Sequence, residues 1–259
     1  MNAVAVTREG PVLTLTLDRP DRRNALGPDL MTELAARVGE AEVDDDVRVI
    51  VLAGAGSAFS AGADIEWMRA SRDLSTEENL ADAVALRVAF RRVDACTKAV
   101  VARVHGPAIG GGAGLVACAD MAIASDGARF AFAEAKLGLI PATIAPYVLR
   151  AIGPGHARTL FTSGRTFDAD EAWRMGLVHT VVHGDELDAV VDRAAQGFLA
   201  CGPNAVAEAK RLIRDATAAY DLPDLSDRIA AARASEEGQE GLAAFLEKRP
   251  PGWAPSNGS

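Results

Sequence analysis

Hydrophobic and polar residues follow two different spacings in the first forty residues. Residues 13–17 alternate leucine with threonine, a period of two that predicts a β-strand with one buried face. From Pro28 onward, Leu30, Leu34 and Val38 recur every four residues, which predicts a helix with proline near its first position. The chain therefore opens with a strand followed by an amphipathic helix.

Three continuous apolar runs follow this first helix. Residues 47–52 (VRVIVL), 99–104 (AVVARV) and 121–124 (MAIA) lack alternation, which is typical of strands buried on both faces. Helical spacing separates these runs, and from about residue 185 onward the pattern is helical only. The order of elements predicts an α/β fold with right-handed crossovers and a helical C-terminal segment.

The amino-acid composition limits the classes of ligand and partner that the protein is expected to bind. The net charge of −9 argues against a nucleic-acid-binding surface. Three scattered cysteines predict reduced thiols, and the four histidines show no metal-ligand spacing, so neither a disulfide framework nor a metal site is expected. The opening MNAVAVTREGPV does not resemble a signal peptide, and no apolar run is long enough to cross a membrane. A cytoplasmic location is the expectation.

Two turns rich in small residues carry the candidate chemistry. Residues 54–64 follow the strand at 47–52, and residues 105–115, with three consecutive glycines, follow the strand at 99–104. Small side chains let a ligand approach backbone N–H groups, and a helix N-terminus favours negative charge. Each turn taken singly also fits a ligand-free connection, and the second fits a phosphate site or close helix packing. No Gly-Lys-Ser/Thr follows, so the P-loop is excluded.

Five segments in this order resemble the crotonase (enoyl-CoA hydratase/isomerase) family from about residue 4 to 253. They are Arg23-Asn-Ala-Leu26, Phe59-Ser-Ala-Gly-Ala-Asp-Ile65, Gly106–Leu115, FAFAEAKLGLIPA around Glu134, and Ala244-Phe-Leu-Glu-Lys-Arg249. The resemblance implies a spiral of ββα units with two roughly perpendicular sheets over residues 1–199. It also implies a helical segment over 200–259 that serves in trimerisation and covers the active site, in a homotrimer or homohexamer.

The resemblance also implies site residues for an acyl-CoA substrate, with coenzyme A as part of the substrate and no separate cofactor. The backbone N–H groups of Ala61 and Gly111 would form the oxyanion hole for the thioester carbonyl. Coenzyme A would be bound by residues of the first turn and of the C-terminus, namely Arg23, Ala25, Ala63, Asp64, Ile65, Phe245 and Lys248.

Glu134 is the candidate acid/base residue. It lies within an apolar stretch, where burial raises the pKa of a carboxyl group towards neutrality. Family hydratases with two catalytic glutamates carry the other shortly after the triple glycine, where this chain has Gly114. Gly114 is costly inside a helix and is expected to make room for substrate or for packing.

The sequence is compatible with two reactions on the same fold, hydration and isomerisation of an enoyl-CoA. A third alternative is a non-catalytic acyl-CoA-binding protein. One carboxylate suffices for hydration of a 2-enoyl-CoA and for Δ3,Δ2-enoyl-CoA isomerisation. Residues 138–147, which include Pro141 of the expected substrate pocket, look like those of bacterial methylglutaconyl-CoA and isohexenylglutaconyl-CoA hydratases. This favours hydration of a branched or dicarboxylic substrate, as in leucine degradation, with Arg69 as the expected cation at the acyl pocket.

Overall fold

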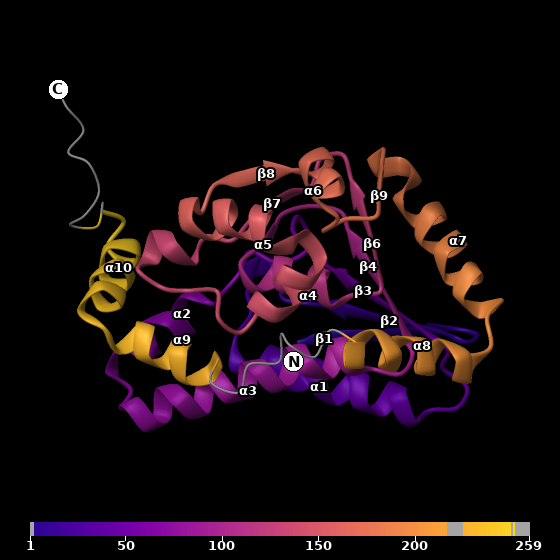
Figure 1. The fold of residues 1–259 in the computed structure, drawn as a ribbon, viewed down its shortest axis with the longest axis horizontal. Coiled ribbons are helices and arrows are strands. Elements are labelled where there is room, and N and C mark those ends of the chain that lie inside the picture. The colour runs from indigo at the N-terminus through magenta and orange to yellow at the C-terminus, as the bar shows by residue number, and fades with distance from the viewer. Residues whose placement is uncertain (1–2, 217–224, 250, 252–259) are drawn as a thin grey trace.

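The computed structural model describes residues 3–216, 225–249 and 251 of the 259-residue chain (Figure 1). The strands are β1 (Val4–Glu9), β2 (Val12–Leu17), β3 (Val49–Gly54), β4 (Ala99–Val104), β5 (Ala108–Ile109), β6 (Met121–Ser125), β7 (Arg129–Ala131), β8 (Thr166–Asp168) and β9 (Thr180–Val182). The α-helices are α1 (Pro28–Val43), α2 (Ile65–Ala70), α3 (Thr76–Ala95), α4 (Gly111–Cys118), α5 (Ala145–Ser163), α6 (Ala169–Met175), α7 (Leu187–Leu199), α8 (Pro203–Ala216), α9 (Leu225–Ala234) and α10 (Glu236–Leu246). Short 3-10 helices are η1 (Pro20–Arg22), η2 (Ser71–Asp73), η3 (Glu134–Leu137) and η4 (Gly184–Glu186).

The larger sheet has the strand order β1-β2-β3-β4-β6-β9, antiparallel between β1 and β2 and parallel elsewhere. One of its faces packs on α7 through a cluster that includes Val49, Val101 and Val191. The other face contributes Leu15, Ile50 and other side chains to the main core, which also holds residues of α1, α3 and α4. Helices on both faces explain why β3 and β4 are apolar apart from Arg103 of β4.

The smaller sheet has the order β5-β7-β8 and sets the position of the second glycine-rich turn. Ala108 and Ile109 of β5 pair in parallel with Phe130 and Ala131 of β7. Strand β5 is followed by α4, and β7 is followed by η3. The pairing of β5 with β7 therefore places η3 beside the N-terminus of α4. The two sheets and the helical C-terminal segment that the resemblance implies are both present.

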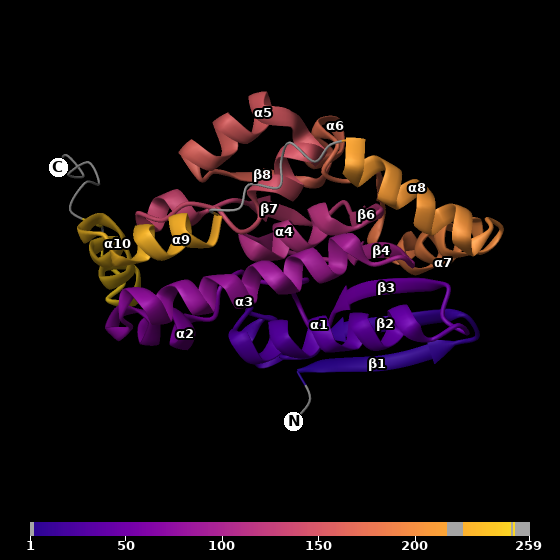
Figure 2. The same ribbon diagram turned by 60° about the horizontal axis from the view of Figure 1, so that its bottom comes forward.

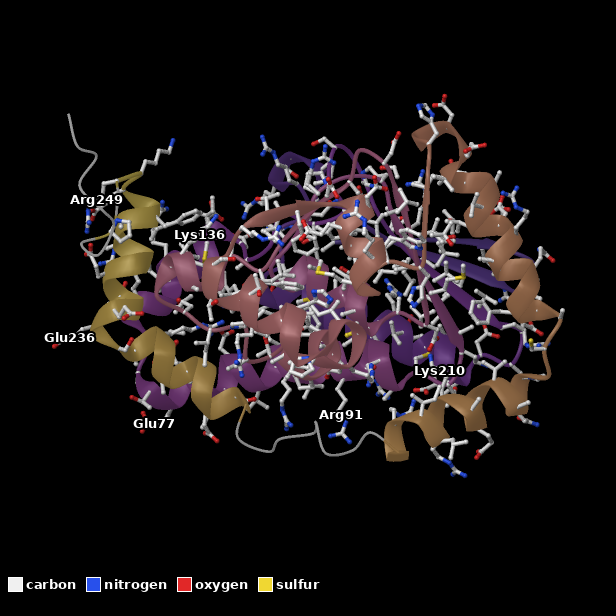
Figure 3. The ribbon with its side chains drawn as sticks, turned by 45° about the horizontal axis from the view of Figure 1, so that its top comes forward. Glu77, Arg91, Lys136, Lys210, Glu236 and Arg249 are labelled. Atoms are coloured by element: carbon white, nitrogen blue, oxygen red, sulfur yellow. The ribbon has the colours of Figure 1, made fainter. Side chains whose placement is uncertain are left out.

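The C-terminal helices lie in two separate places (Figures 1 and 2). Helix α8 is near α7, and Lys210 anchors it because the Lys210 Nζ atom donates to the Asp120 carboxylate at 2.5 Å and to the Lys98 carbonyl at 2.8 Å (Figure 3). Helix α9 packs along α3, and α10 packs against η3 and α2. The division at residues 199/200 and the homotrimer or homohexamer stay predictions.

Each element expected from the sequence has a counterpart in the structure. The expected strands correspond to β2, β3, β4 and β6, and the helix expected from Pro28 is α1. Strands β1, β5, β7, β8 and β9 did not emerge from the apolar pattern. Four of these, β5 and β7–β9, have two or three residues each, too few to show a period.

Candidate active site

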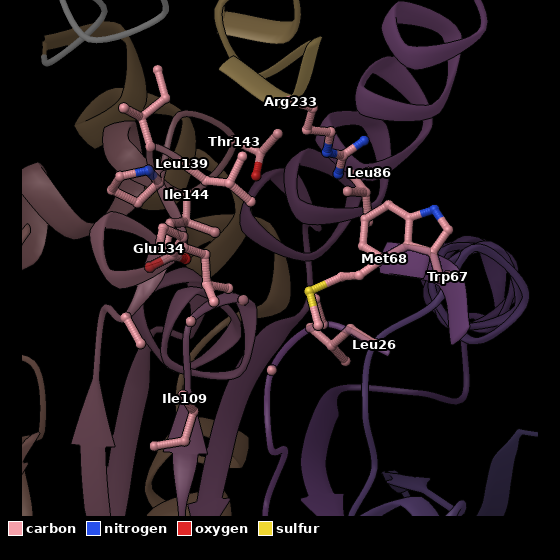
Figure 4. A pocket seen from close by; sticks show the side chains of 18 of the residues that line it. Leu26, Trp67, Met68, Leu86, Ile109, Glu134, Leu139, Thr143, Ile144 and Arg233 are labelled. Carbon is pink, nitrogen blue, oxygen red and sulfur yellow. The ribbon is translucent and has the colours of Figure 1, made fainter. Parts of the chain in front are cut away.

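A pocket opens between the two glycine-bearing turns and is closed on one side by the C-terminal helices. Elements far apart in the sequence contribute to its lining, which includes Ala63, Gly111, Glu134, Ile144, Arg233 and Phe245 (Figure 4). Most of the remaining lining is aliphatic or aromatic, as in Leu26, Met68, Leu86 and Phe90. An apolar cavity with few polar groups is typical of a small-molecule site.

Asn24 holds the first turn in place. Its side-chain N–H₂ group donates to the carbonyls of Ala55 at 2.7 Å and Ala58 at 2.8 Å, and the Ser60 hydroxyl donates to the Asn24 carbonyl at 2.8 Å. Asn24 is fully buried and has φ = 55°, a left-handed conformation that asparagine tolerates better than most residues. Sequence reasoning did not assign it a role, although it lies in a segment that carries the family resemblance.

Ala63, and not Ala61, presents a free N–H group to the pocket. The Ala61 N–H donates to the Arg23 carbonyl at 2.9 Å, so it is already used. The Leu26 N–H donates to the Gly62 carbonyl at 2.7 Å and the Asp64 N–H to the Leu26 carbonyl at 2.9 Å. This parallel bridge turns the Ala63 N–H away from Leu26, and within the described chain it has no partner. The Ala61 N–H is therefore not available for the role expected of it, and the unpaired N–H of this turn lies two residues later.

A second unpaired N–H in the pocket lining is that of Gly111, the other residue expected to donate. Helix α4 begins there, and no acceptor for this N–H exists among residues that the structure describes. The positive end of the α4 dipole lies at the same point. Gly110 has φ = +52°, a backbone conformation that favours glycine, and an added Cβ would make a tight contact of 3.1 Å with Glu134 Oε1.

Glu134 begins η3 and lines the pocket beside Gly110. The Glu134 Oε2 atom is buried and lacks a hydrogen-bond partner in the described structure. Burial raises the pKa of Glu134 to about 7, against an ordinary value of 4.5. A carboxylate with this pKa can both accept and return a proton near neutral pH.

Glutamine at position 134 is expected to stabilise the fold at alkaline pH. The pKa of Glu134 is about 7 in the folded protein and about 4.5 ordinarily, so ionisation of Glu134 disfavours the folded state. This loss of stability grows as pH rises from 4.5 to 7. The shift corresponds to about 3 kcal/mol above pH 8. Urea unfolding of wild type and Glu134→Gln should show this gain at pH 8 and little of it at pH 5. An equal gain at both pH values would contradict it.

Gly114 packs against protein and is not among the residues that line the pocket. An added Cβ would lie 2.3 Å from Ile144 Cγ2 and 2.8 Å from Ile144 Cβ. Of the two roles expected for Gly114, the structure supports packing. Ile144 occupies the space that a glutamate at 114 needs, so the site has room for one carboxylate.

Alanine at position 114 is expected to destabilise the protein by about 1–3 kcal/mol through this overlap with Ile144. Helix propensity alone predicts the opposite sign, a gain of about 1 kcal/mol. Urea unfolding of Gly114→Ala, Ile144→Ala and the double variant measures the coupling between the two sites. The double variant should lose less stability than the sum of the single losses. A stabilised Gly114→Ala variant, or strict additivity, would contradict the steric explanation.

The residues expected to bind coenzyme A fall into three groups. Ala63 and Phe245 line the pocket, as does Pro141 of the expected acyl pocket. Arg23, Ile65 and Lys248 are exposed outside the lining. Ala25 is buried outside it.

Asp64 has a structural role that the sequence did not indicate. It is buried and caps α2 by accepting from the N–H groups of Glu66 and Trp67. Arg19 and Arg22 lie 3.1 and 3.2 Å from its Oδ2 atom. Burial raises the pKa of Asp64, but the two backbone donors and the arginines outweigh this and lower it overall. The carboxylate therefore stays ionised and holds the first turn against η1.

Arg69, the cation expected at the acyl pocket, is exposed on α2 and lies outside the lining. Arg233 of α9 occupies the pocket instead. The sequence did not single it out, because the helical pattern of that region does not show where α9 packs. Among residues that the structure describes, no group of three or more histidine, cysteine, aspartate or glutamate side chains could hold a metal ion. No helix in the same residues is long and apolar enough to cross a membrane.

Comparison with known proteins agrees with this geometry. A family model described as enoyl-CoA hydratase/isomerase matches residues 7–256. The short-chain-enoyl-CoA hydratase of Clostridium acetobutylicum is 34% identical over 258 residues, covering 96% of both chains. The crotonyl-CoA hydratase of Syntrophomonas wolfei is 34% identical over 253 residues, covering 95% of both.

Solved structures give the same result for the fold. An enoyl-CoA hydratase from Mycobacterium avium aligns with a TM-score of 0.85 at 32% identity, covering 97% of this chain and 99% of that one. An enoyl-CoA hydratase from Shewanella pealeana aligns with a TM-score of 0.81 at 37% identity, covering 97% and 96%. The pocket geometry, the match along nearly the whole chain and these structures together establish that the chain belongs to the enoyl-CoA hydratase/isomerase family, the crotonases.

Proposed function

We propose that this protein is an enoyl-CoA hydratase that adds water to a 2-enoyl-CoA thioester, with Glu134 as its single acid/base residue. The observation that carries the proposal is the Glu134 carboxyl group, with its pKa of about 7, which lines the same apolar pocket as two residues with unpaired backbone N–H groups. This arrangement combines a proton carrier with fixed donors for a developing oxyanion.

The reaction follows from the position of these groups. Ionised Glu134 takes a proton from water as the water oxygen bonds to C3. The C2=C3 electron pair moves towards the thioester oxygen, and the N–H groups of Ala63 and Gly111 stabilise the enolate. Protonated Glu134 then returns the proton to C2, so the enzyme ends as it began. The single-carboxylate cycle needs no group at position 114.

Coenzyme A is proposed to run from the pocket to the surface along the first turn and α10. Arg23 and Lys248 are exposed cations suited to phosphate groups, and Ile65 and Phe245 are exposed apolar side chains near this route. Ala25 and Asp64 would contribute by shaping the turn between them, since both are buried. The acyl group is proposed to be branched or dicarboxylic, and 3-methylglutaconyl-CoA is the first substrate to test.

Two alternatives share the scaffold. One carboxylate also suffices for a Δ3,Δ2-enoyl-CoA isomerase, in which Glu134 carries a proton between C4 and C2. A binding protein without chemistry needs no carboxylate, and the pKa of about 7 at Glu134 favours a catalytic role.

Absorbance of the conjugated enoyl thioester separates these functions. Purified protein is mixed in turn with 3-methylglutaconyl-CoA, crotonyl-CoA and a 3-enoyl-CoA, with Glu134→Gln as the control. Loss of absorbance with a 2-enoyl substrate, absent in the variant, supports the hydratase. Absorbance gained from the 3-enoyl substrate alone would establish the isomerase, and binding without any change would establish the binding protein.

A further inference from the structure

Arg233 is the one cationic side chain among the described residues that line the pocket. Only 6% of the residue is exposed, although arginine is rarely buried without a specific partner. Its neighbours in the lining include Trp67, Met68 and Leu86, and Figure 4 places Arg233 on a different side of the pocket from Glu134. An apolar cavity therefore has an acid at one wall and a guanidinium at another.

Trp67 and Asp82 hold the Arg233 guanidinium in one orientation. The Asp82 Oδ2 atom accepts from Arg233 Nη1 at 2.8 Å and from Trp67 Nε1 at 2.9 Å. The Arg233 Cζ atom lies 4.5 Å from the centre of the Trp67 ring, a cation–π contact. Such a preorganised guanidinium loses little side-chain entropy when it binds a further group.

Part of the guanidinium is left open to a ligand. Within the described chain, the Arg233 side chain makes its one hydrogen bond through Nη1. This leaves Nε and Nη2 without a hydrogen bond to the described chain. Burial lowers the pKa of Arg233, and the Asp82 carboxylate offsets this only in part. The cation is thus incompletely compensated by protein groups.

The orientation that an acyl-CoA must take in the pocket places its acyl chain, and not its coenzyme A part, near Arg233. Coenzyme A is large and must extend to solvent, whereas the acyl chain takes the buried part of the pocket. An alkyl chain end would leave the remaining N–H groups of Arg233 without acceptors. A carboxylate can accept two parallel N–H bonds from one guanidinium and restores the lost solvation.

We infer that Arg233, positioned by Asp82 and Trp67, determines acyl specificity by binding a carboxylate at the far end of the acyl chain. The substrate class is then a 2-enoyl-CoA with a terminal carboxylate. The inference rests on the proposed function, because it assumes that the ligand is a 2-enoyl-CoA. It assigns to Arg233 the role in binding the acyl group that the sequence suggested for Arg69. If Arg233 served only to hold α9 against α3, the protein would show no preference among acyl chain ends.

Binding of saturated thioesters tests this without any chemistry. Isothermal titration calorimetry gives Kd for succinyl-, glutaryl- and adipyl-CoA, for the terminal amide of each, and for alkyl thioesters of the same length. In wild type, the best-fitting diacid should bind about ten- to a hundred-fold tighter than its amide and its alkyl analogue. Arg233→Met should erase this preference while the Kd of the alkyl thioester changes about two-fold or less.

Arg233→Lys is the second variant, which keeps the charge but loses the planar fork, and it should retain part of the preference. Exposed Arg69→Met is the matched control and should bind like wild type. The inference would be overturned if wild type bound diacid and alkyl thioesters with equal affinity. It would also be overturned if the Arg233 variants lost affinity for the diacid and the alkyl thioesters to the same extent. Equal binding of diacid and amide would assign a neutral acceptor in place of the carboxylate. Because no turnover is measured, a protein that shows the preference but never hydrates refutes only the hydratase proposal.

Discussion

Glutamine at position 134 lowers kcat for hydration by about 10²–10⁴-fold or more, the largest effect expected of any single side chain here. The reason is that the site has one carboxylate, since Ile144 fills the space at Gly114 that a second would need. The amide has the same shape, but it can neither accept the proton from water nor return it to C2. Stopped-flow absorbance with the best 2-enoyl-CoA of the substrate panel measures the loss.

The same residue predicts the pH dependence. Hydration begins with ionised Glu134, so kcat/KM should fall as pH decreases through about 7, the pKa that burial produces in the free protein. Exposed Glu9→Gln on β1 is a control with the same chemical change and should keep both the rate and the profile. A Glu134→Gln variant that retains more than a tenth of wild-type kcat would show that another group moves the proton.

Replacing the backbone N–H of Ala63 by an ester oxygen lowers kcat/KM by about 10²–10³-fold, the second large effect. Incorporating lactic acid at position 63 makes this change while leaving the methyl side chain in place. The donor lost is the one proposed to face the thioester oxygen, and its contribution is expected to grow as negative charge develops there. Affinity for a saturated acyl-CoA should change much less, because a ground-state carbonyl carries less charge.

Lactic acid at position 61 is the matched control. It removes an N–H that donates to the Arg23 carbonyl, so the cost is expected in stability, by about 0.5–1.5 kcal/mol, and only slightly in kcat/KM. Steady-state kinetics and urea unfolding of both esters distinguish the two positions. A larger catalytic loss at position 61 than at 63 would restore the original assignment of the oxyanion hole.

Local patterns in the sequence predicted the elements whose burial is simple. Strands β3 and β4 are enclosed on both faces, which requires a continuous apolar run, and the period of four after Pro28 reflects one buried face of α1. Glu134 could be selected for a similar reason, because a carboxylate in an apolar stretch must have a specific role. The order of segments added the crotonase fold and Gly111.

The sequence by itself thus determined the family, and it selected Glu134 and Gly111 as candidate site residues. Only the tertiary structure decided that the free N–H of the first turn is that of Ala63, because which N–H is free depends on the pairing of residues 60–64 with Arg23 and Leu26. It also decided that Gly114 serves packing and that Arg233 replaces Arg69 in the pocket. These outcomes depend on contacts between α4 and Ile144 and between α9 and α3, and a local pattern of residues cannot specify contacts between segments distant along the chain.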